Sequence, residues 1–357
     1  MTRVSLGRLA VCGALATALA GGSAAAQDVT GRAAVEAVVS ASVTSKTLDA
    51  PFVVMDAVTT FRIGHGWDAV VRPWVARMTA GDWHTEMYQM QVRYVSSTRV
   101  PFRVDAGIIS SPLGLATFEL RADRNPTIGA PFYYYVPLPP FDGHFDGVTL
   151  MSGGYPLGAV LSASGSHWDA RAGVTDSSPT LSRSVFSATR APAMAQVIGG
   201  AGVTPIPGFR LGVGFAQGRY RAPATTPTGV SLPGESATVF NVEGEYSIGY
   251  TRVAGEWIAD RFDTTKSPAL ARGFNLDATR TLNPRWFVSA RTARTSSPTL
   301  TAPTPLRLSA VSAEGTLGYR LTRSFTLRGG YQGSRMFKSR EWQHAAAVSM
   351  VWAQRWW

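Results

Sequence analysis

The stretch Phe209-Arg-Leu-Gly-Val-Gly-Phe-Ala-Gln-Gly218 alternates bulky apolar residues with small or polar ones. Successive side chains of a β-strand point to opposite faces, so the two kinds of residue separate onto the two faces of an extended chain. The bulky face carries Phe209, Leu211, Val213 and Phe215. The stretch therefore predicts a strand that meets an apolar environment on one side only.

Fifteen further segments after Ala26 show the same alternation, so the sequence predicts sixteen strands. Short links between them alternate with longer links that are rich in Pro, Ser, Thr and Gly. This rhythm is typical of antiparallel transmembrane barrels, which have tight periplasmic turns and longer external loops. The predicted strands are residues 32–43, 53–63, 67–78, 85–95, 102–109, 146–163, 168–175, 193–203, 209–220, 237–248, 250–262, 273–282, 285–294, 306–321, 324–336 and 341–357. A barrel of eighteen strands, in which 146–163 is interrupted at Gly154, is the second choice.

These strands predict an all-β fold, in which residues 27–357 form a 16-stranded antiparallel transmembrane β-barrel. The alternative is a secreted soluble all-β protein that acts as a binding or structural module, because half-buried sheets alternate too. The polar face favours the barrel, since it is rich in Gly, Ala, Ser and Thr as well as charge. Trp and Tyr residues also gather near the ends of the predicted strands, as expected for aromatic belts at two membrane interfaces.

The first 26 residues have the features of a secretory signal peptide. Arg3 and Arg8 precede the apolar run Leu9–Leu19, and the small residues Ala24–Ala26 form a cleavage site. We expect residues 1–26 to be removed after export, together with the single cysteine, Cys12. The exported chain then needs no disulfide. No later run approaches the about 18 apolar residues of a membrane helix.

Composition narrows the class of function. Loss of the signal peptide lowers the net charge from +11 to +9, and basic exported chains can bind nucleic acid, lipopolysaccharide or anionic solutes. No basic run is interleaved with stacking aromatics, so we expect no nucleic-acid partner. The five histidines are scattered and match no metal motif. We therefore expect no catalytic residues, no metal, no cofactor and no enzymatic activity.

The polar faces of the predicted strands place charged residues on the inside of the barrel. Because the first strand pairs with the last, one basic wall forms from Arg62, Arg93, Arg103, Arg291, Arg320 and Arg328. An acidic wall across the pore consists of Glu243, Glu245, Glu256, Asp260 and Asp277. Charge that lines a pore can select ions, which makes the basic wall a candidate anion filter. The alternative is that these charges only solvate a wide channel and pair with their neighbours.

The stretch 110–145 has no alternation and is long for a simple connection, which indicates a special role. Its charged residues are Glu119, Arg121, Asp123 and Arg124, and its aromatic row includes Tyr133, Tyr134 and Tyr135. The aromatic row can serve as a sliding surface for sugar rings, or it can anchor the loop against the barrel wall. The sequence leaves both open.

Residues Pro101–Leu115, the long loop and Phe145–Gly153 together resemble Gram-negative outer-membrane porins, particularly the phosphate-selective-porin-like group. In that group a strand that ends in a Pro-Phe-Gly-Leu-like step leads into a third loop, which folds into the barrel and narrows it. Pro112-Leu113-Gly114-Leu115 has Leu where Phe is usual. The resemblance implies an inward-folded loop at 110–145 and assembly as a homotrimer.

The resemblance also concerns the end of the chain. Porins tend to end in Phe with another aromatic two residues earlier, whereas here Trp357 is last and Arg355 occupies the earlier place. We expect Trp357 to be the signal for the barrel-assembly machinery. The sequence thus predicts a passive diffusion porin in the outer membrane of a Gram-negative bacterium, in contact with lipid and lipopolysaccharide. We expect it to pass small hydrophilic solutes with a weak preference for anions.

Overall fold

The computed structural model describes residues 33–46, 51–77, 81–96, 101–114, 121–130, 134, 136–139, 148–151, 155–176, 180, 196–221, 223–225, 231–264, 267–299 and 306–356. The predicted signal peptide and Trp357 lie outside these described residues, as do Glu119, Tyr133 and Tyr135.

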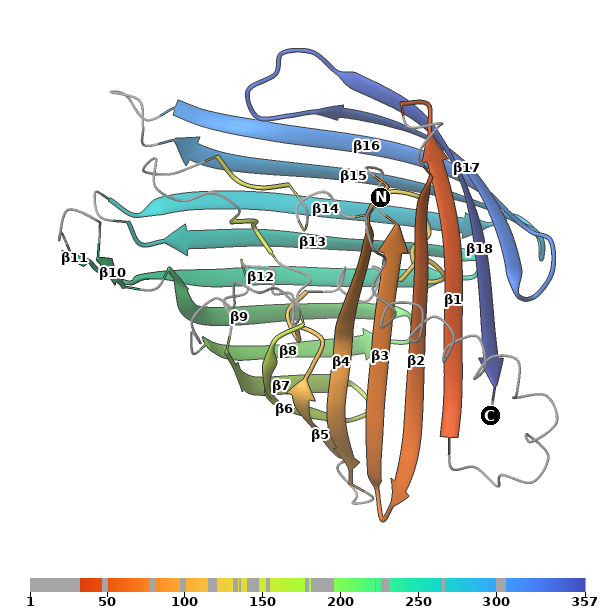
Figure 1. Ribbon diagram of the computed structural model, residues 1–357, viewed down its shortest axis with the longest axis horizontal. Helices are drawn as coiled ribbons and strands as arrows, with labels where there is room; N and C mark the ends of the chain where they lie inside the picture. The colour runs from red at the N-terminus through yellow and green to blue at the C-terminus, as the bar shows by residue number, and fades with distance from the viewer. Residues whose placement is uncertain are drawn as a thin grey trace, which may run out of the picture.

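Sixteen antiparallel strands in the described part of the chain form one closed barrel (Figure 1), which confirms the predicted all-β fold. Strand β18 pairs with β1 to close the ring, for example Trp352 with Val39. The barrel strands are β1 (Ala33–Thr44), β2 (Phe52–Gly64), β3 (Trp67–Arg77), β4 (Trp83–Val95), β5 (Phe102–Ile108), β6 (Leu157–Ser164), β7 (Trp168–Thr175), β8 (Gln196–Ile206), β9 (Phe209–Arg221), β12 (Glu235–Ile248), β13 (Thr251–Phe262), β14 (Ala269–Thr281), β15 (Trp286–Thr299), β16 (Leu306–Arg320), β17 (Phe325–Arg335) and β18 (Gln343–Trp356). Two short strands, β10 (Ala224–Thr225) and β11 (Ser231–Leu232), pair only with each other.

The sixth barrel strand is shorter than the sequence predicts. It begins at Leu157 rather than at residue 146, because Pro156 has no backbone N–H to donate to a neighbouring strand. Val148, Leu150 and Met151, which the prediction placed in this strand, are buried within the loop that precedes it. The other fifteen predicted strands overlap the observed ones.

The two ends of the barrel differ. At one end, connections of two to six residues join strands such as β8 and β9 or β12 and β13, and β1 begins and β18 ends there. We call this the turn end, and the opposite one the loop end. Gly208 in one of these turns has φ +83°, and a Cβ there would lie 2.3 Å from the carbonyl oxygen of Ser247. Because barrels of this kind have short turns on the periplasmic side, we assign the turn end to the periplasm.

The outer and inner faces of the barrel wall separate as the alternation predicts. On β9, Leu211, Val213 and Phe215 are 41–46% exposed on the outside, whereas Gly212, Gly214 and Ala216 are buried on the inside. At the turn end the outward rings of Trp286 and Tyr319 contact each other with centroids 4.6 Å apart. No helix among the described residues has the length and apolar composition needed to cross a membrane. The described wall therefore has an apolar outer surface and a small or polar inner surface.

The apolar outer face predicts a depth-dependent cost for charge. Val213 lies between the turn-end pair Phe209 and Tyr246 and the loop-end residue Arg219. In a lipid bilayer we expect Val213→Arg to lower the free energy of unfolding by about 2–4 kcal/mol, and Gln217→Arg, nearer the loop end, by about 0–1 kcal/mol. Urea titration of the protein folded in lipid vesicles measures both. Equal, small losses for the two variants would contradict the assignment of this face to lipid.

Candidate functional site

The chain leaves β5 at Ile108 and enters the inside of the barrel. The backbone N–H of Ile109 donates to the carbonyl of Pro156 at 2.9 Å, so the beginning and the end of this inner segment are joined. Leu113 is fully buried, and its Cδ1 atom lies 3.0 Å from where a Cβ would stand on Gly214 of β9. Gly114 has φ +86°, and a Cβ there would lie 2.7 Å from Oε1 of Glu256 on β13. Glycine is therefore required where the loop meets this wall.

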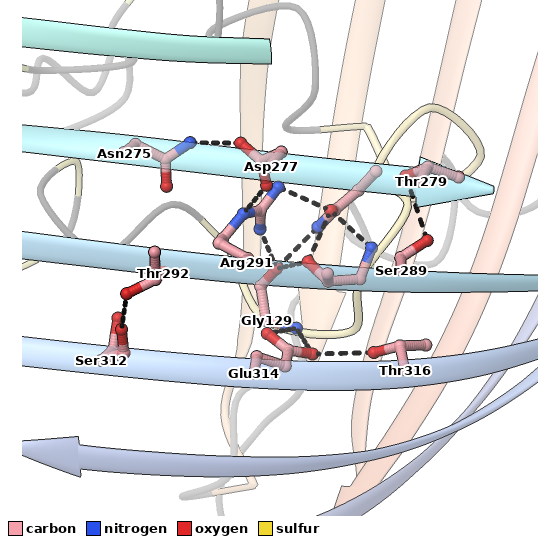
Figure 2. Close-up of polar contacts among 12 residues, drawn as sticks. Gly129, Asn275, Asp277, Thr279, Ser289, Arg291, Thr292, Ser312, Glu314 and Thr316 are labelled. Carbon is pink, nitrogen blue, oxygen red and sulfur yellow. Dashed lines mark hydrogen bonds and ion pairs between the residues drawn. The ribbon is translucent and has the colours of Figure 1, made fainter. Parts of the chain in front are cut away.

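Glu314 on β16 holds a second part of the loop (Figure 2). Its carboxylate accepts from the backbone N–H of Ile128 at 2.7 Å and from that of Gly129 at 3.0 Å. Thr316 donates to the same carboxylate at 3.3 Å. A carboxylate that accepts backbone N–H groups in a buried place forms stronger hydrogen bonds than a neutral acceptor does. Glu314 therefore fixes residues 128 and 129 against the β16 wall.

Two arginines also bind the loop. Together with Glu314 they form what we call the clamp. Arg291 on β15 forms an ion pair with Asp277 on β14, and it donates to the carbonyl of Gly129 at 2.7 Å (Figure 2). Arg328 on β17 donates to the carbonyls of Asn125 at 2.7 Å and Thr127 at 2.9 Å. Both arginines are less than 6% exposed. They face inward as the sequence predicts, but the structure places them beneath the loop rather than along an open pore.

Apolar contacts hold the remaining described parts of the loop. Leu150 reaches the position of Gly273 on β14, and Val136 packs with Ala293 and Ala310 on β15 and β16. The Tyr134 hydroxyl donates to the sulfur of Met151 at 3.2 Å. Of the two roles open for the aromatic row, the structure gives Tyr134 that of an anchor, since it is only 4% exposed.

The inward-folded loop also covers most of the predicted acidic wall. Glu243, Glu256, Asp260 and Asp277 are each at most 4% exposed. Glu243 accepts from Arg210 at 2.7 Å. Glu245, the fifth predicted residue, lies near the turn end and pairs with Arg252 at 2.9 Å.

A cavity of about 1110 Å³ remains on the other side of the lumen, along β1–β7. The loop residues Ile109–Pro112, Arg121 and Arg124 form part of its lining. Its charged lining consists of eight arginines and four carboxylates. These residues are Arg62, Arg72, Arg93, Arg103, Arg121, Arg124, Arg171 and Arg355, and Glu36, Asp68, Asp105 and Asp169. The lining therefore has more positive than negative side chains, and acids behind it pair with three of its arginines: Asp56 with Arg72, Asp123 with Arg121 and Glu243 with Arg171.

Asp105 is a buried carboxylate with two arginines between it and the cavity. Its carboxylate pairs with Arg93 at 2.8 Å and with Arg103 at 2.7 Å. The carboxylate is 7% exposed, whereas the two arginine side chains are 26% and 48% exposed. A solute in the cavity thus meets two guanidinium groups, and the one compensating charge lies behind them.

Glu36 on β1 is surrounded in a similar way, at the edge of the loop. Arg121, Arg124 and Arg355 lie within 3.0, 3.9 and 3.4 Å of its carboxylate oxygens. Burial alone would lower the pKa of Arg121, but hydrogen bonds and opposite charge from Asp123 and Glu36 raise it above its ordinary value. Arg121 therefore remains cationic at any physiological pH.

An aromatic stack with an ion pair lies deeper, and the sequence did not predict it. The ring of Tyr88 stacks on Trp74 at 4.9 Å and on Tyr155 at 4.3 Å between centroids. Arg72 forms a two-point ion pair with Asp56 and donates to the Tyr155 hydroxyl at 3.1 Å. Burial raises the pKa of Tyr155 to about 12 although Arg72 opposes this, so the hydroxyl stays neutral. Arg72 and Asp56 occupy polar faces of adjacent predicted strands, which is the signal that could have identified the pair.

The predicted site residues divide by location into those that line the cavity, those buried under the loop and those near the turn end. Arg62, Arg93 and Arg103 line the cavity, and the loop residues Arg121 and Arg124 join them. Arg320 lies near the turn end, with its guanidinium 4.9 Å from the ring centroid of Phe287. Among the described residues, no group of three or more His, Cys, Asp or Glu side chains could hold a metal ion.

Comparisons with known proteins identify the fold. No protein-family model matches the sequence, and no curated protein matches it. Solved structures do match. OmpT of Vibrio cholerae, expressed in the outer membrane, has a TM-score of 0.59 at 10% identity over 90% of this chain and 97% of its own. An anion-selective porin from Comamonas acidovorans has a TM-score of 0.56 at 12% identity over 90% and 99%. OmpF of Salmonella typhi, in complex with daunomycin, has a TM-score of 0.55 at 9% identity over 90% and 97%. The chain thus shares the 16-stranded barrel fold of outer-membrane porins.

The clamp on the loop gives a prediction that does not depend on function. Glu314→Gln replaces a charged acceptor by a neutral one, so we expect the Ile128 and Gly129 amide protons to exchange with solvent at least tenfold faster. Hydrogen-exchange NMR or mass spectrometry measures this. Glu245→Gln is the matched control, since that inward carboxylate pairs with Arg252 instead of the loop. Unchanged exchange in Glu314→Gln would show that the clamp does not order the loop.

Proposed function

We propose that this chain is a porin, a passive diffusion channel for small hydrophilic solutes in the outer membrane of a Gram-negative bacterium. The observation that carries the proposal is the polar cavity along β1–β7, bounded by an inward-folded loop within a barrel whose outer face is apolar. A soluble sheet would bury its apolar face. Here Leu211, Val213 and Phe215 are exposed outside, while the carboxylates of the neighbouring strands, such as Glu243 and Glu256, lie inside.

The charge of the cavity supports a weak preference for anions. Eight arginines against four carboxylates raise the local concentration of anions, and the effect falls with salt because the Debye length is about 8–10 Å at physiological ionic strength. The carboxylates keep the preference from becoming strict. One structural neighbour is itself an anion-selective porin, which agrees with this proposal. A preference for phosphate in particular stays a prediction of the sequence resemblance.

The partners and the absence of catalysis belong to the same proposal. We expect assembly as a homotrimer, insertion by the barrel-assembly machinery through Trp357, and contact with lipopolysaccharide. One structural neighbour is described in a trimer form, which agrees with the first of these. The arrangement we propose needs no enzymatic step, since solutes cross by diffusion.

A reconstitution experiment separates the porin from the alternative, a secreted soluble all-β protein. We expect the folded protein to change its mobility on gels when heated, to fractionate with the outer membrane, and to give discrete conductance steps in planar bilayers. A protein that stays in the soluble fraction and produces no steps would support the alternative.

The anion preference has its own test. We expect a reversal potential of the anion-preferring sign across a KCl gradient, larger in dilute salt, and a shift toward zero when Arg93 and Arg103 are both changed to Gln. The double change removes both exposed guanidinium groups in front of Asp105. The matched control is Arg280→Gln with Arg323→Gln, which removes the same charge from residues that do not line the cavity. A cation-preferring wild type, or an equal shift in both double variants, would overturn the role of the cavity arginines.

A further inference from the structure

On β9 and β12–β17, arginines lie on both faces of the wall, whereas the carboxylates face inward. In the described strands, the carboxylates Glu243, Glu256, Asp260, Asp277 and Glu314 all lie on the inner face and are buried. The outer face carries arginines near the loop end of its strands. These residues are Arg219, Arg261, Arg272, Arg294, Arg307 and Arg335. We call them the outer arginines. The first four of them alternate with buried residues, and Arg307 and Arg335 pair across the sheet with the outward positions Pro298 and Val311.

The outer arginines lie at the height of one membrane surface. On β15, Trp286 marks the turn-end interface, and Trp286–Arg294 is a span of nine residues. A transmembrane β-strand needs about 9–11 residues to cross the hydrocarbon core. Since the loop end faces outward from the cell, Arg294 and its neighbours reach the headgroups of the outer leaflet.

A groove of about 550 Å³ runs down the outer wall directly below two of these arginines. Arg294 and Arg335 both lie opposite Val311 on β16, and the groove begins two residues further toward the turn end, at Ala313. Its floor consists of small residues such as Ala290, Ala313 and Gly315.

The groove is open at its floor and bounded by larger side chains. A Cβ added at Gly315 would meet no atom within 4 Å. Leu276, Tyr331 and Trp342 border the space, and all three are exposed. The Tyr331 hydroxyl lies 3.0 Å from His344 Nδ1, and the Arg335 guanidinium lies 5.9 Å from the Trp342 ring centroid. The groove thus has a guanidinium and an interfacial tryptophan at its loop end.

We propose that this face binds a phosphorylated, multiply acylated glycolipid of the outer leaflet, the lipid part of lipopolysaccharide. Arg294 and Arg335 bind a phosphate, since guanidinium groups match phosphate oxygens at two points. One acyl chain lies in the groove over Ala313 and Gly315. The inference rests on the outer-membrane location in the proposed function. A second copy of this chain is a poorer occupant of the arginine-bearing face, because it would bring further positive charge to a face whose described strands carry outward arginines.

The test is lipid binding by the full-length folded protein in detergent, measured by native mass spectrometry. The probes are lipid A with two phosphates, lipid A with one phosphate, and phosphatidylglycerol. We expect lipid A with two phosphates to bind best, and Arg294→Gln with Arg335→Gln to weaken it at least tenfold. Arg280→Gln with Arg323→Gln is the control for charge. Equal binding of phosphatidylglycerol and lipid A, or wild-type affinity in the Arg294 and Arg335 variant, overturns the proposal.

A second pair of variants tests the groove. Gly315→Leu adds a side chain to the groove at a position where a Cβ meets no atom within 4 Å, and we expect it to weaken lipid A binding at least tenfold. Gly329→Leu is the matched control, since its Cβ also meets nothing within 4 Å but lies outside the groove. A change of oligomeric state in Gly315→Leu with unchanged lipid binding would make this face a subunit interface and overturn the proposal. A protein that conducts ions but binds no lipid A would contradict this inference alone, whereas one that forms no heat-modifiable barrel would contradict the proposed function.

Discussion

The closure of the backbone hydrogen bonds between β18 and β1 is the constraint on which the rest of this structure depends. In hydrocarbon no water can satisfy an open strand edge, so a sheet crosses a membrane only as a closed ring. Closure fixes which face of every strand looks outward, because side chains alternate along each strand. The ten paired positions from Val35 with Trp356 to Thr44 with Ala347 make this seam as continuous as the other strand pairs. Once the ring is closed, each polar face is committed to the lumen.

A polar lumen provides hydrogen-bond partners for the backbone of the loop that enters it. The backbone of residues 121–130 needs hydrogen-bond partners inside the barrel, and Glu314, Arg291 and Arg328 supply them. These charges therefore serve the loop, and the wall that holds them is covered. The uncovered side along β1–β7 keeps its arginines in contact with the cavity, with Asp105 behind two of them. The asymmetry of the lumen follows from where the loop is bound.

The sequence alone predicts much of the fold, because alternation is a local property. It predicts a strand over 209–220, which overlaps β9, and gives the correct inward direction for Arg93, Arg291 and Arg328. It cannot distinguish their surroundings. Arg328 contacts Asn125, about 200 positions away in sequence, so whether its side chain meets water or the loop depends on the path of a distant segment. The long predicted strand 146–163 was wrong in its first half for the same reason, since apolar residues there pack inside the barrel rather than within its wall.

We propose that the cavity along β1–β7 is the water-filled path, while the wall under the loop is closed to water. Cysteine accessibility tests this most directly, since the only native cysteine is Cys12. Thr60→Cys lies in the cavity lining, and Thr295→Cys replaces an inward residue of β15 that is fully buried. We expect a charged, membrane-impermeant thiol reagent to modify Thr60→Cys quickly, with the anionic reagent faster than the cationic one, and to leave Thr295→Cys unmodified. Fast modification of Thr295→Cys together with protection of Thr60→Cys would contradict it.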